Sequence, residues 1–136
     1  MMPYERFRAW QKCHELALAV HWITREWPRE ERYGLTAQAH RAAFSAAANI
    51  VEGSARQGFR EFRRFLDITL GSLYELSYIL RLARDLEFSP IERLEAVEEI
   101  RASAGRLTWR LYESVKQHSL PHGGTLRGQA SDPPTA

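Results

Sequence analysis

Apolar residues recur at intervals of three and four along most of the chain, which predicts amphipathic helices. Turn-forming residues separate four such segments: residues 4–27, 35–56, 59–86 and 90–118. Pro28 ends the first segment, and Gly58 separates the second from the third. Ser89-Pro90 predicts the start of the fourth, with serine as N-cap and proline in the first turn. No strand-like alternation of useful length occurs, so the pattern predicts an all-α fold.

Each predicted helix has an apolar stripe that we assign to the core. In the first helix the stripe comprises Phe7, Trp10, His14, Ala17, His21 and Thr24, with Val20 and Trp27 beside it. In the third it comprises Phe62, Phe65, Leu66, Thr69, Leu73, Leu76, Leu80 and Ala83. In the fourth it comprises Ile91, Leu94, Val97, Ile100, Ala104, Leu107, Leu111 and Val115. The second helix is rich in alanine, which favours helix and lets neighbouring backbones approach closely.

The connections between these helices are short, which favours antiparallel neighbours. We therefore expect residues 1–118 to form one up-down-up-down four-helix bundle, and 136 residues suit a single hydrophobic core. Residues 119–136 are rich in Pro, Gly, Ser and Thr and have no apolar periodicity. Such a segment buries too little surface to offset its ordering entropy, so we expect a disordered C-terminal tail.

The third predicted helix carries apolar residues on its outer face as well as on its core face. With about 100° per residue, one outer face contains Leu70, Gly71, Tyr74, Tyr78 and Leu82, with Glu75 beside them. A bundle of this size cannot enclose such a helix on all sides, so we expect self-association, chiefly through the second and third helices. Glu75 is placed to pair with an arginine of a neighbouring subunit. The alternative is that these are the scattered apolar residues normal on a monomer's surface.

The sequence offers no motif for catalysis, for a metal or for a cofactor. The single cysteine, Cys13, excludes an internal disulfide and cysteine-based zinc sites, and we expect it to be a buried thiol. None of His14, His21, His40 and His118 has an acidic residue three positions earlier, as di-metal bundles require. A glycine-rich phosphate loop is also absent. We therefore expect no enzymatic activity.

The N-terminus is polar, and no apolar run approaches the ~20 residues that span a bilayer. We therefore expect no membrane association and a cytoplasmic location. The formal net charge of +2 is too small to indicate nucleic-acid binding by itself.

One segment, residues 56–64, concentrates positive charge, with four arginines against a single glutamate. The arginines are Arg56, Arg60, Arg63 and Arg64, and the last three are predicted to share an exposed helix face. Such a cluster can hold phosphates, with strong salt dependence and little sequence selectivity. The alternative is a solvated helix start whose arginines pair with carboxylates elsewhere.

The second helix contains the run Arg41-Ala-Ala-Phe-Ser45-Ala-Ala-Ala-Asn49-Ile-Val-Glu52-Gly53, followed by Arg56. This run resembles the central motif of the four-helix-bundle proteins encoded by 23S rRNA intervening sequences. Trp10-Gln-Lys and residues 31–35 resemble the family's early signature, and Gly71-Ser72 with Glu75-Leu76 resembles its third helix. The resemblance covers about residues 7–115. Gly58 departs from it, because the family usually has a serine helix cap there.

The resemblance implies a four-helix bundle that assembles into a ring, typically a homopentamer, without established enzymatic activity. It assigns structural roles to Arg41, Ser45, Asn49, Glu52, Gly53 and Ser72. A related branch, the accessory variability determinant proteins of diversity-generating retroelements, binds nucleic acid and works with a reverse transcriptase. We therefore expect a ring-forming scaffold that binds RNA or DNA through its basic surface. The alternative is an accessory subunit that docks a partner such as a reverse transcriptase.

Overall fold

The computed structural model describes residues 1–118, and within them the chain forms helices and turns without any strand. Four long helices make up most of it: α1 (Arg8–Ile23), α2 (Leu35–Ser54), α3 (Phe59–Asp85) and α4 (Ile91–His118). Short 3-10 turns lie at Pro3–Arg6, Thr24–Glu26 and Arg29–Glu31. The four predicted helices are therefore confirmed to within a few residues at each end. The expected C-terminal tail lies outside the described residues.

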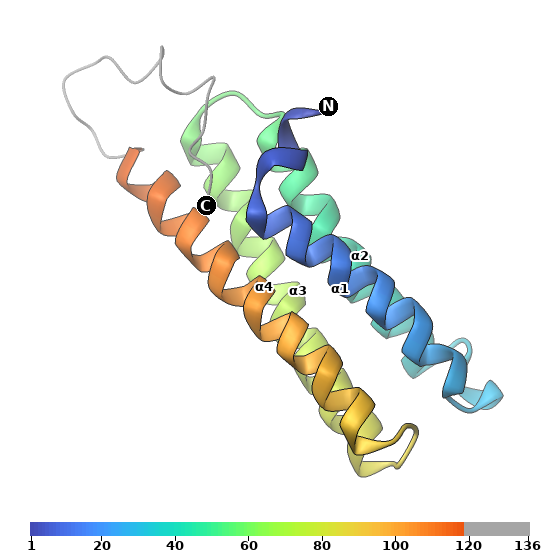
Figure 1. Ribbon diagram of the computed structural model, residues 1–136. Helices are drawn as coiled ribbons and strands as arrows, with labels where there is room; N and C mark the ends of the chain where they lie inside the picture. Colours follow the sequence, from blue (N-terminus) through green and yellow to red (C-terminus); the bar gives the residue numbers. More distant parts are fainter. Residues whose placement is uncertain (119–136) are drawn as a thin grey trace.

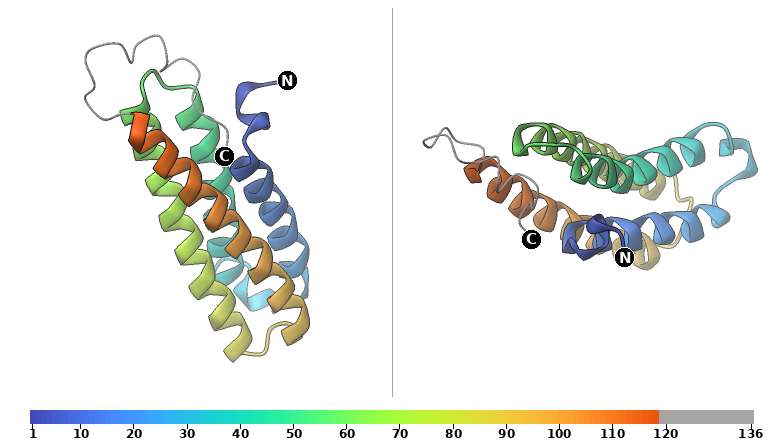
Figure 2. Two further views of the ribbon diagram at one scale, coloured as in Figure 1. Left: turned by 60° about the vertical axis from the view of Figure 1, so that its left-hand side comes forward. Right: turned by 90° about the horizontal axis from the view of Figure 1, so that it is seen from above.

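Consecutive helices run in opposite directions and pack side by side (Figure 1). Seen along the bundle, α2 and α3 form one layer, and α1 and α4 form the other (Figure 2). The start of α1, the turn between α2 and α3, and the end of α4 thus meet at one end of the molecule. Each helix contacts the helices next to it in chain order, and α1 also contacts α4.

Residue chemistry explains where two of the helices begin. Gly58 caps α3 with a φ of 91°, a left-handed conformation that glycine adopts without strain. At the start of α4, the predicted N-cap Ser89 is buried, and its Oγ accepts a hydrogen bond from the indole Nε1 of Trp27 at 2.9 Å. Since Trp27 follows α1, this bond ties the α1–α2 connection to the α3–α4 connection.

The core face of α3 matches the prediction, because all eight residues of its predicted stripe are buried. In α4 the stripe is confirmed except at its first turn, where Ile91 is exposed, and at the half-buried Ile100. Two observations show how tightly α3 packs on α2. A Cβ added to Gly53 would lie 2.7 Å from the Cβ of Phe65. The hydroxyl of Thr69 donates to the carbonyl oxygen of Ala46 at 2.8 Å.

The core face of α1 matches the prediction in part, because Phe7, Val20, Thr24 and Trp27 are buried as expected. Its buried residues are Ala9, Cys13, Leu16, Val20 and Ile23. His14 and His21 are exposed, and Trp10 is only half-buried. The core occupies a neighbouring face because imidazole and indole rings carry polar nitrogens that favour the rim, whereas small residues allow close helix approach.

Cys13 is a buried free thiol, as predicted. Burial raises its pKa to about 12, and a side-chain hydrogen bond with Thr108 opposes part of that rise. The sulfur and the Thr108 hydroxyl oxygen are 4.0 Å apart. The thiol therefore stays protonated at physiological pH, which makes it a poor nucleophile.

Candidate nucleic-acid interface

Charge is distributed unevenly along the bundle. When each helix is divided near its middle, residues 1–15, 45–72 and 105–118 fall in the half that contains the α2–α3 turn (Figure 1). We call this half the basic end. Its cationic residues are Arg6, Arg8, Lys12, Arg56, Arg60, Arg63, Arg64, Arg106, Arg110 and Lys116. Its acidic residues are Glu5, Glu15, Glu52, Glu61, Asp67 and Glu113.

The opposite half of the described chain has the reverse imbalance. It contains eight arginines and ten carboxylates, whereas the basic end contains ten cationic and six acidic side chains. The small net charge of the whole chain thus conceals a separation of charge between its two ends. A positive field at one end attracts anions more strongly than the net charge suggests.

Two of the predicted arginines lie against the same aromatic ring. The guanidinium carbons of Arg56 and Arg64 are 5.1 Å and 4.7 Å from the ring centroid of Phe65. Arg56 belongs to the turn after α2 and Arg64 to the second turn of α3, so the α2–α3 turn brings them together. Arg56 also pairs with Glu52 at 2.8 Å, and Arg64 with Glu61 at 3.3 Å. All four charged side chains are about half exposed, so these ion pairs contribute little and can exchange for phosphate.

The other two predicted arginines differ from each other. Arg60 is exposed at the start of α3. Arg63 is half-buried and has a bonding partner, so it does not fully share the exposed face that the sequence predicts. The end of α4 adds Arg106 and Arg110, both exposed. Sequence reasoning missed this contribution because only the antiparallel packing of α4 brings these residues to the same end as the α2–α3 turn.

A polar seam joins α2 and α3 on the outer side of the bundle. Arg41 donates to both carboxylate oxygens of Glu75 at 2.7 Å and to the amide oxygen of Gln38 at 2.7 Å. Glu75 is thus paired within its own chain, whereas the sequence also placed it to pair with an arginine of a neighbouring subunit. The local reason is that residues 41 and 75 face each other across the antiparallel pair.

The seam continues through three further motif residues. The hydroxyl of Ser72 donates to the hydroxyl of Ser45 at 2.9 Å. The side-chain amide of Asn49 donates to the carbonyl oxygen and the hydroxyl oxygen of Ser45, at 2.8 and 3.0 Å. These bonds satisfy half-buried polar groups and fix the register of α2 against α3. Among the motif residues, Arg41, Ser45, Asn49 and Ser72 therefore have a structural role here.

The outer face predicted for self-association is partly exposed in the single subunit. Tyr74 and Tyr78 are 76% and 65% exposed, and Phe44 on α2 is 70% exposed. Leu70 and Leu82 are half-buried. Gly71 is exposed as well, and apart from the local backbone of its own helix no heavy atom lies within 4 Å of the position that a Cβ on it would occupy. The glycine is therefore not required for packing inside this subunit.

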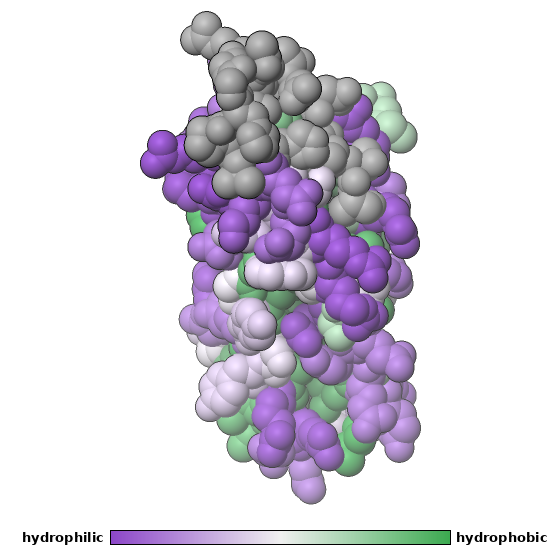
Figure 3. Space-filling view, turned by 90° about the vertical axis from the view of Figure 1, so that its left-hand side faces the viewer, coloured by the Kyte–Doolittle hydropathy of each residue, from purple (hydrophilic) through white to green (hydrophobic). Residues whose placement is uncertain are grey.

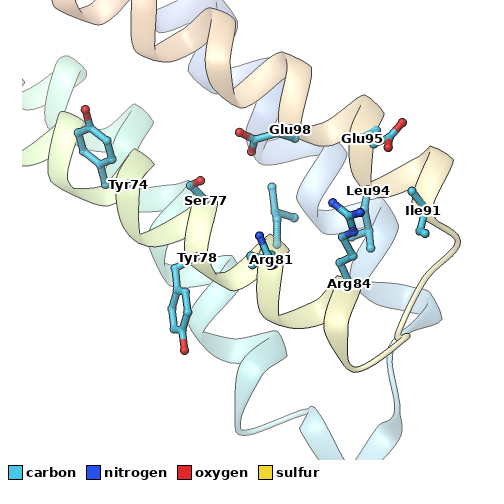
Figure 4. Close-up of a pocket in the computed structure, with 10 residues that line it drawn as sticks. Tyr74, Ser77, Tyr78, Arg81, Arg84, Ile91, Leu94, Glu95 and Glu98 are labelled. Atoms are coloured by element: carbon cyan, nitrogen blue, oxygen red, sulfur yellow. The ribbon is translucent and has the colours of Figure 1, made fainter.

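A groove of about 470 Å³ runs between α3 and α4 at the end opposite the basic end. Arg81 and Arg84 project from α3, and Glu95 and Glu98 project from α4 (Figure 4). Apolar surface shows between hydrophilic side chains in the lower part of this side of the molecule (Figure 3). The groove thus combines an apolar floor, to which Leu94 contributes, with walls of opposite charge.

Among the histidines of the described chain, His40 has a lowered pKa, first because burial disfavours its charged form and then because His21 repels that charge. The two rings stack with centroids 5.0 Å apart. The Nε2 of His40 lies 2.8 Å from the hydroxyl oxygen of Thr24, which donates to the carbonyl oxygen of Val20. In the bond between Thr24 and His40 either atom can be the donor, depending on the tautomer of His40.

Residues 1–118 contain neither a metal-binding cluster nor a membrane-spanning helix. Nowhere in that range do three or more His, Cys, Asp or Glu side chains gather as a metal site would require. None of the helices there is long and apolar enough to cross a membrane.

Comparison with known proteins places the chain in a family. The family model described as 23S rRNA-intervening sequence protein matches residues 5–109. A crystal structure of a protein of unknown function from the S23 ribosomal protein family of Bacteroides thetaiotaomicron VPI-5482 is similar, with a TM-score of 0.70 and 23% sequence identity. The match covers 77% of this chain and 95% of that chain, and it supports the fold alone. A comparison with curated proteins gave no match. The chain belongs to the 23S rRNA-intervening sequence protein family.

Proposed function

We propose that this protein is a non-enzymatic, ring-forming scaffold that binds RNA through its basic end. The observation that carries the proposal is the separation of charge, with ten cationic and six acidic side chains at one end of the bundle. Arg56, Arg60 and Arg64 are exposed at this end. The ion pairs of Arg56 and Arg64 lie on the surface and are weak, so they would not compete strongly with phosphate. Such contacts bind the sugar-phosphate backbone without reading its sequence.

Self-association is the second part of the proposal, and the outer face of α3 supports it. Tyr74 and Tyr78 on α3 and Phe44 on α2 leave large aromatic surfaces exposed in the single subunit, as an interaction surface would. Gly71 sits within this face and costs α3 about 0.5–1 kcal/mol relative to alanine. A glycine is useful at this position if the backbone of another subunit approaches it closely, because a larger side chain would keep the two backbones apart. A closed ring would repeat the basic end around one rim and multiply its field.

The proposed binding is tested by removing the same number of positive charges from either end of the bundle and comparing the RNA affinities of the two variants. Arg60, Arg63 and Arg64 are replaced together by alanine, and the matched control replaces Arg25, Arg29 and Arg32 at the opposite end. Both variants lose three positive charges. We expect the first to bind a structured RNA at least about tenfold more weakly and the control to retain most of the affinity.

The fold of the first variant needs a check, because Arg63 is half-buried and has a partner. The double variant Arg60→Ala with Arg64→Ala avoids that residue and should still lose affinity. Equal affinities for the basic-end variants and the opposite-end control would refute the site. A mass of about five times 15.7 kDa by light scattering would support the ring, and a single-subunit mass at micromolar concentration would refute it.

A second candidate function is an accessory subunit that docks a protein partner such as a reverse transcriptase. The groove between α3 and α4 favours it, because an apolar floor flanked by Arg81 and Glu98 suits a protein surface. In that case the charge reversals Arg81→Glu and Arg84→Glu should release a co-purifying reverse transcriptase. The same variant should leave RNA affinity unchanged. Little RNA affinity of the protein alone would favour this candidate over the first.

A further inference from the structure

An aromatic stack lies on α4 within the basic end. The indole of Trp109 stacks on the ring of Tyr112, with centroids 5.4 Å apart and planes 15° from parallel. Tyr112 is half-buried and packs against the core, whereas Trp109 is 52% exposed. The stack therefore consists of one anchored ring and one ring that is half open to the surroundings.

The charges around the stack are mostly positive. Arg106 precedes Trp109 by three residues and so lies on the same side of α4, and Arg110 follows it directly. Both arginines are exposed. Lys116 is exposed two turns further along, and the half-buried Glu113 is the carboxylate on this stretch. An aromatic ring among cations suits a ligand that combines flat rings with negative charge.

Another exposed tryptophan provides a contrast. Trp22 near the end of α1 is 60% exposed, but the guanidinium carbon of Arg25 lies 4.1 Å from its ring centroid and covers one side of it. Trp22 also belongs to the half of the bundle in which carboxylates exceed arginines. Both tryptophans are thus exposed. Of the two, Trp109 has both a stacked partner ring and mostly cationic surroundings.

We propose that the Trp109–Tyr112 stack is a platform for an unpaired base of single-stranded nucleic acid. The inference rests on the proposed binding at the basic end and narrows its ligand to segments with unpaired bases. In a duplex the bases stack on one another and cannot lie on a protein ring, whereas an unpaired base can extend the existing stack. The arginines at 106 and 110 would hold the phosphates on either side of that base.

The test measures affinity for three labelled probes of about 12 nucleotides or base pairs: polyuridine, polythymidine DNA and a blunt RNA duplex. Trp109→Ala is compared with Trp109→Phe, which keeps an aromatic ring, and with Trp22→Ala as the matched control. We expect Trp109→Ala to weaken binding of both single strands about 5- to 100-fold and to leave duplex binding unchanged. Trp109→Phe should retain most of the affinity, and Trp22→Ala should retain all of it. A difference between the RNA and DNA strands would show whether the 2′-hydroxyl contributes.

Three outcomes would overturn the platform. One is unchanged single-strand affinity in Trp109→Ala, and another is an equal loss in Trp22→Ala. The third is a change of oligomeric mass in Trp109→Ala, which would assign the ring to a contact between copies. The variant with Arg60 and Arg64 replaced separates this inference from the proposed function. If that variant binds all probes normally while Trp109→Ala does not, the arginine contacts proposed at the α2–α3 turn fail and the platform on α4 stands.

Discussion

The guanidinium of Arg41 on α2 lies 2.7 Å from both carboxylate oxygens of Glu75 on α3, 34 residues later in the chain. Both bonds come from the same guanidinium nitrogen, Nη2, and both side chains are about half exposed, at 55% and 42%. We therefore expect a double-mutant cycle with Arg41→Ala and Glu75→Ala to give a coupling energy of about 0.2–1 kcal/mol in the free energy of unfolding. Urea titrations of the four proteins measure it. A coupling indistinguishable from zero would contradict the pairing.

The two glycines of α2 and α3 should respond to alanine in opposite ways. A Cβ on Gly53 would clash with Phe65 at 2.7 Å, and overpacking of this kind costs about 1–3 kcal/mol. A Cβ on Gly71 meets nothing within 4 Å, so alanine there should stabilise the isolated subunit by about 0.5–1 kcal/mol. Chemical denaturation of the two variants at a concentration below self-association compares them directly. A stabilised Gly53→Ala would show that the helices are less closely packed than described.

Gly71 should also control assembly. A glutamine side chain at this exposed position causes no clash inside the subunit. It would, however, keep the backbone of a neighbouring copy from approaching α3 closely. We expect Gly71→Gln to lower the oligomeric mass measured by light scattering. The control is Ala96→Gln, which adds the same side chain at an exposed site on α4. Equal masses for the two variants would place the self-association surface elsewhere.

Much of the fold could be predicted from the sequence where leucine and phenylalanine recur at helical spacing, because a helix with such a stripe buries it in the core. The stripe of α3 was predictable for that reason, from Phe62 to Ala83. The complete buried face of α1 could not be predicted in the same way. Trp10, His14 and His21 have the spacing of core residues, but their rings lie at the rim of the core or in solvent. The buried face of α1 also includes Ala9 and Cys13, small residues whose contribution to packing appears only when the neighbouring helices are in place.

The candidate site shows the same limit. A local cluster such as residues 56–64 can be found in the sequence, since its arginines are neighbours along the chain. The contribution of Arg106 and Arg110 depends on which helix ends meet, and the partner of Glu75 depends on the register between α2 and α3. Tertiary packing sets both, and no local pattern encodes them.

Acid should destabilise the fold through His40. Its native pKa lies below the value of about 6.5 that it has in an unfolded chain, because burial and the neighbouring His21 disfavour the charged form. Above that pH the residue is neutral in both states and has no effect. As the pH falls below about 6.5, the unfolded chain binds a proton that the native protein resists, so the free energy of unfolding decreases.

The decrease should continue until the pH also passes the native pKa of His40. We expect His40→Gln, whose side-chain amide can still form a hydrogen bond with Thr24, to lose stability less steeply over this range. Urea titrations between pH 5 and pH 8 measure the difference. Parallel curves for the variant and the unchanged protein would assign the acid sensitivity to another group.

Cys13 should be nearly inert in the native protein. Burial raises its pKa to about 12, so very little reactive thiolate is present at neutral pH, and the side chain is inaccessible to reagents. We expect a thiol reagent such as Ellman's reagent to modify it only as fast as the bundle opens, and immediately after denaturation. Rapid modification without denaturant would contradict its place between α1 and α4.

The salt dependence of RNA binding tests the central claim, that the basic end contacts phosphates, more directly than any single affinity. The logarithm of the association constant should fall linearly with the logarithm of salt concentration for the unchanged protein. Each lost contact lowers the steepness by about 0.7–0.9, so replacing Arg60, Arg63 and Arg64 should reduce it by about 2–3. Replacing Arg25, Arg29 and Arg32 should leave it unchanged. Identical slopes for the three proteins would contradict the account.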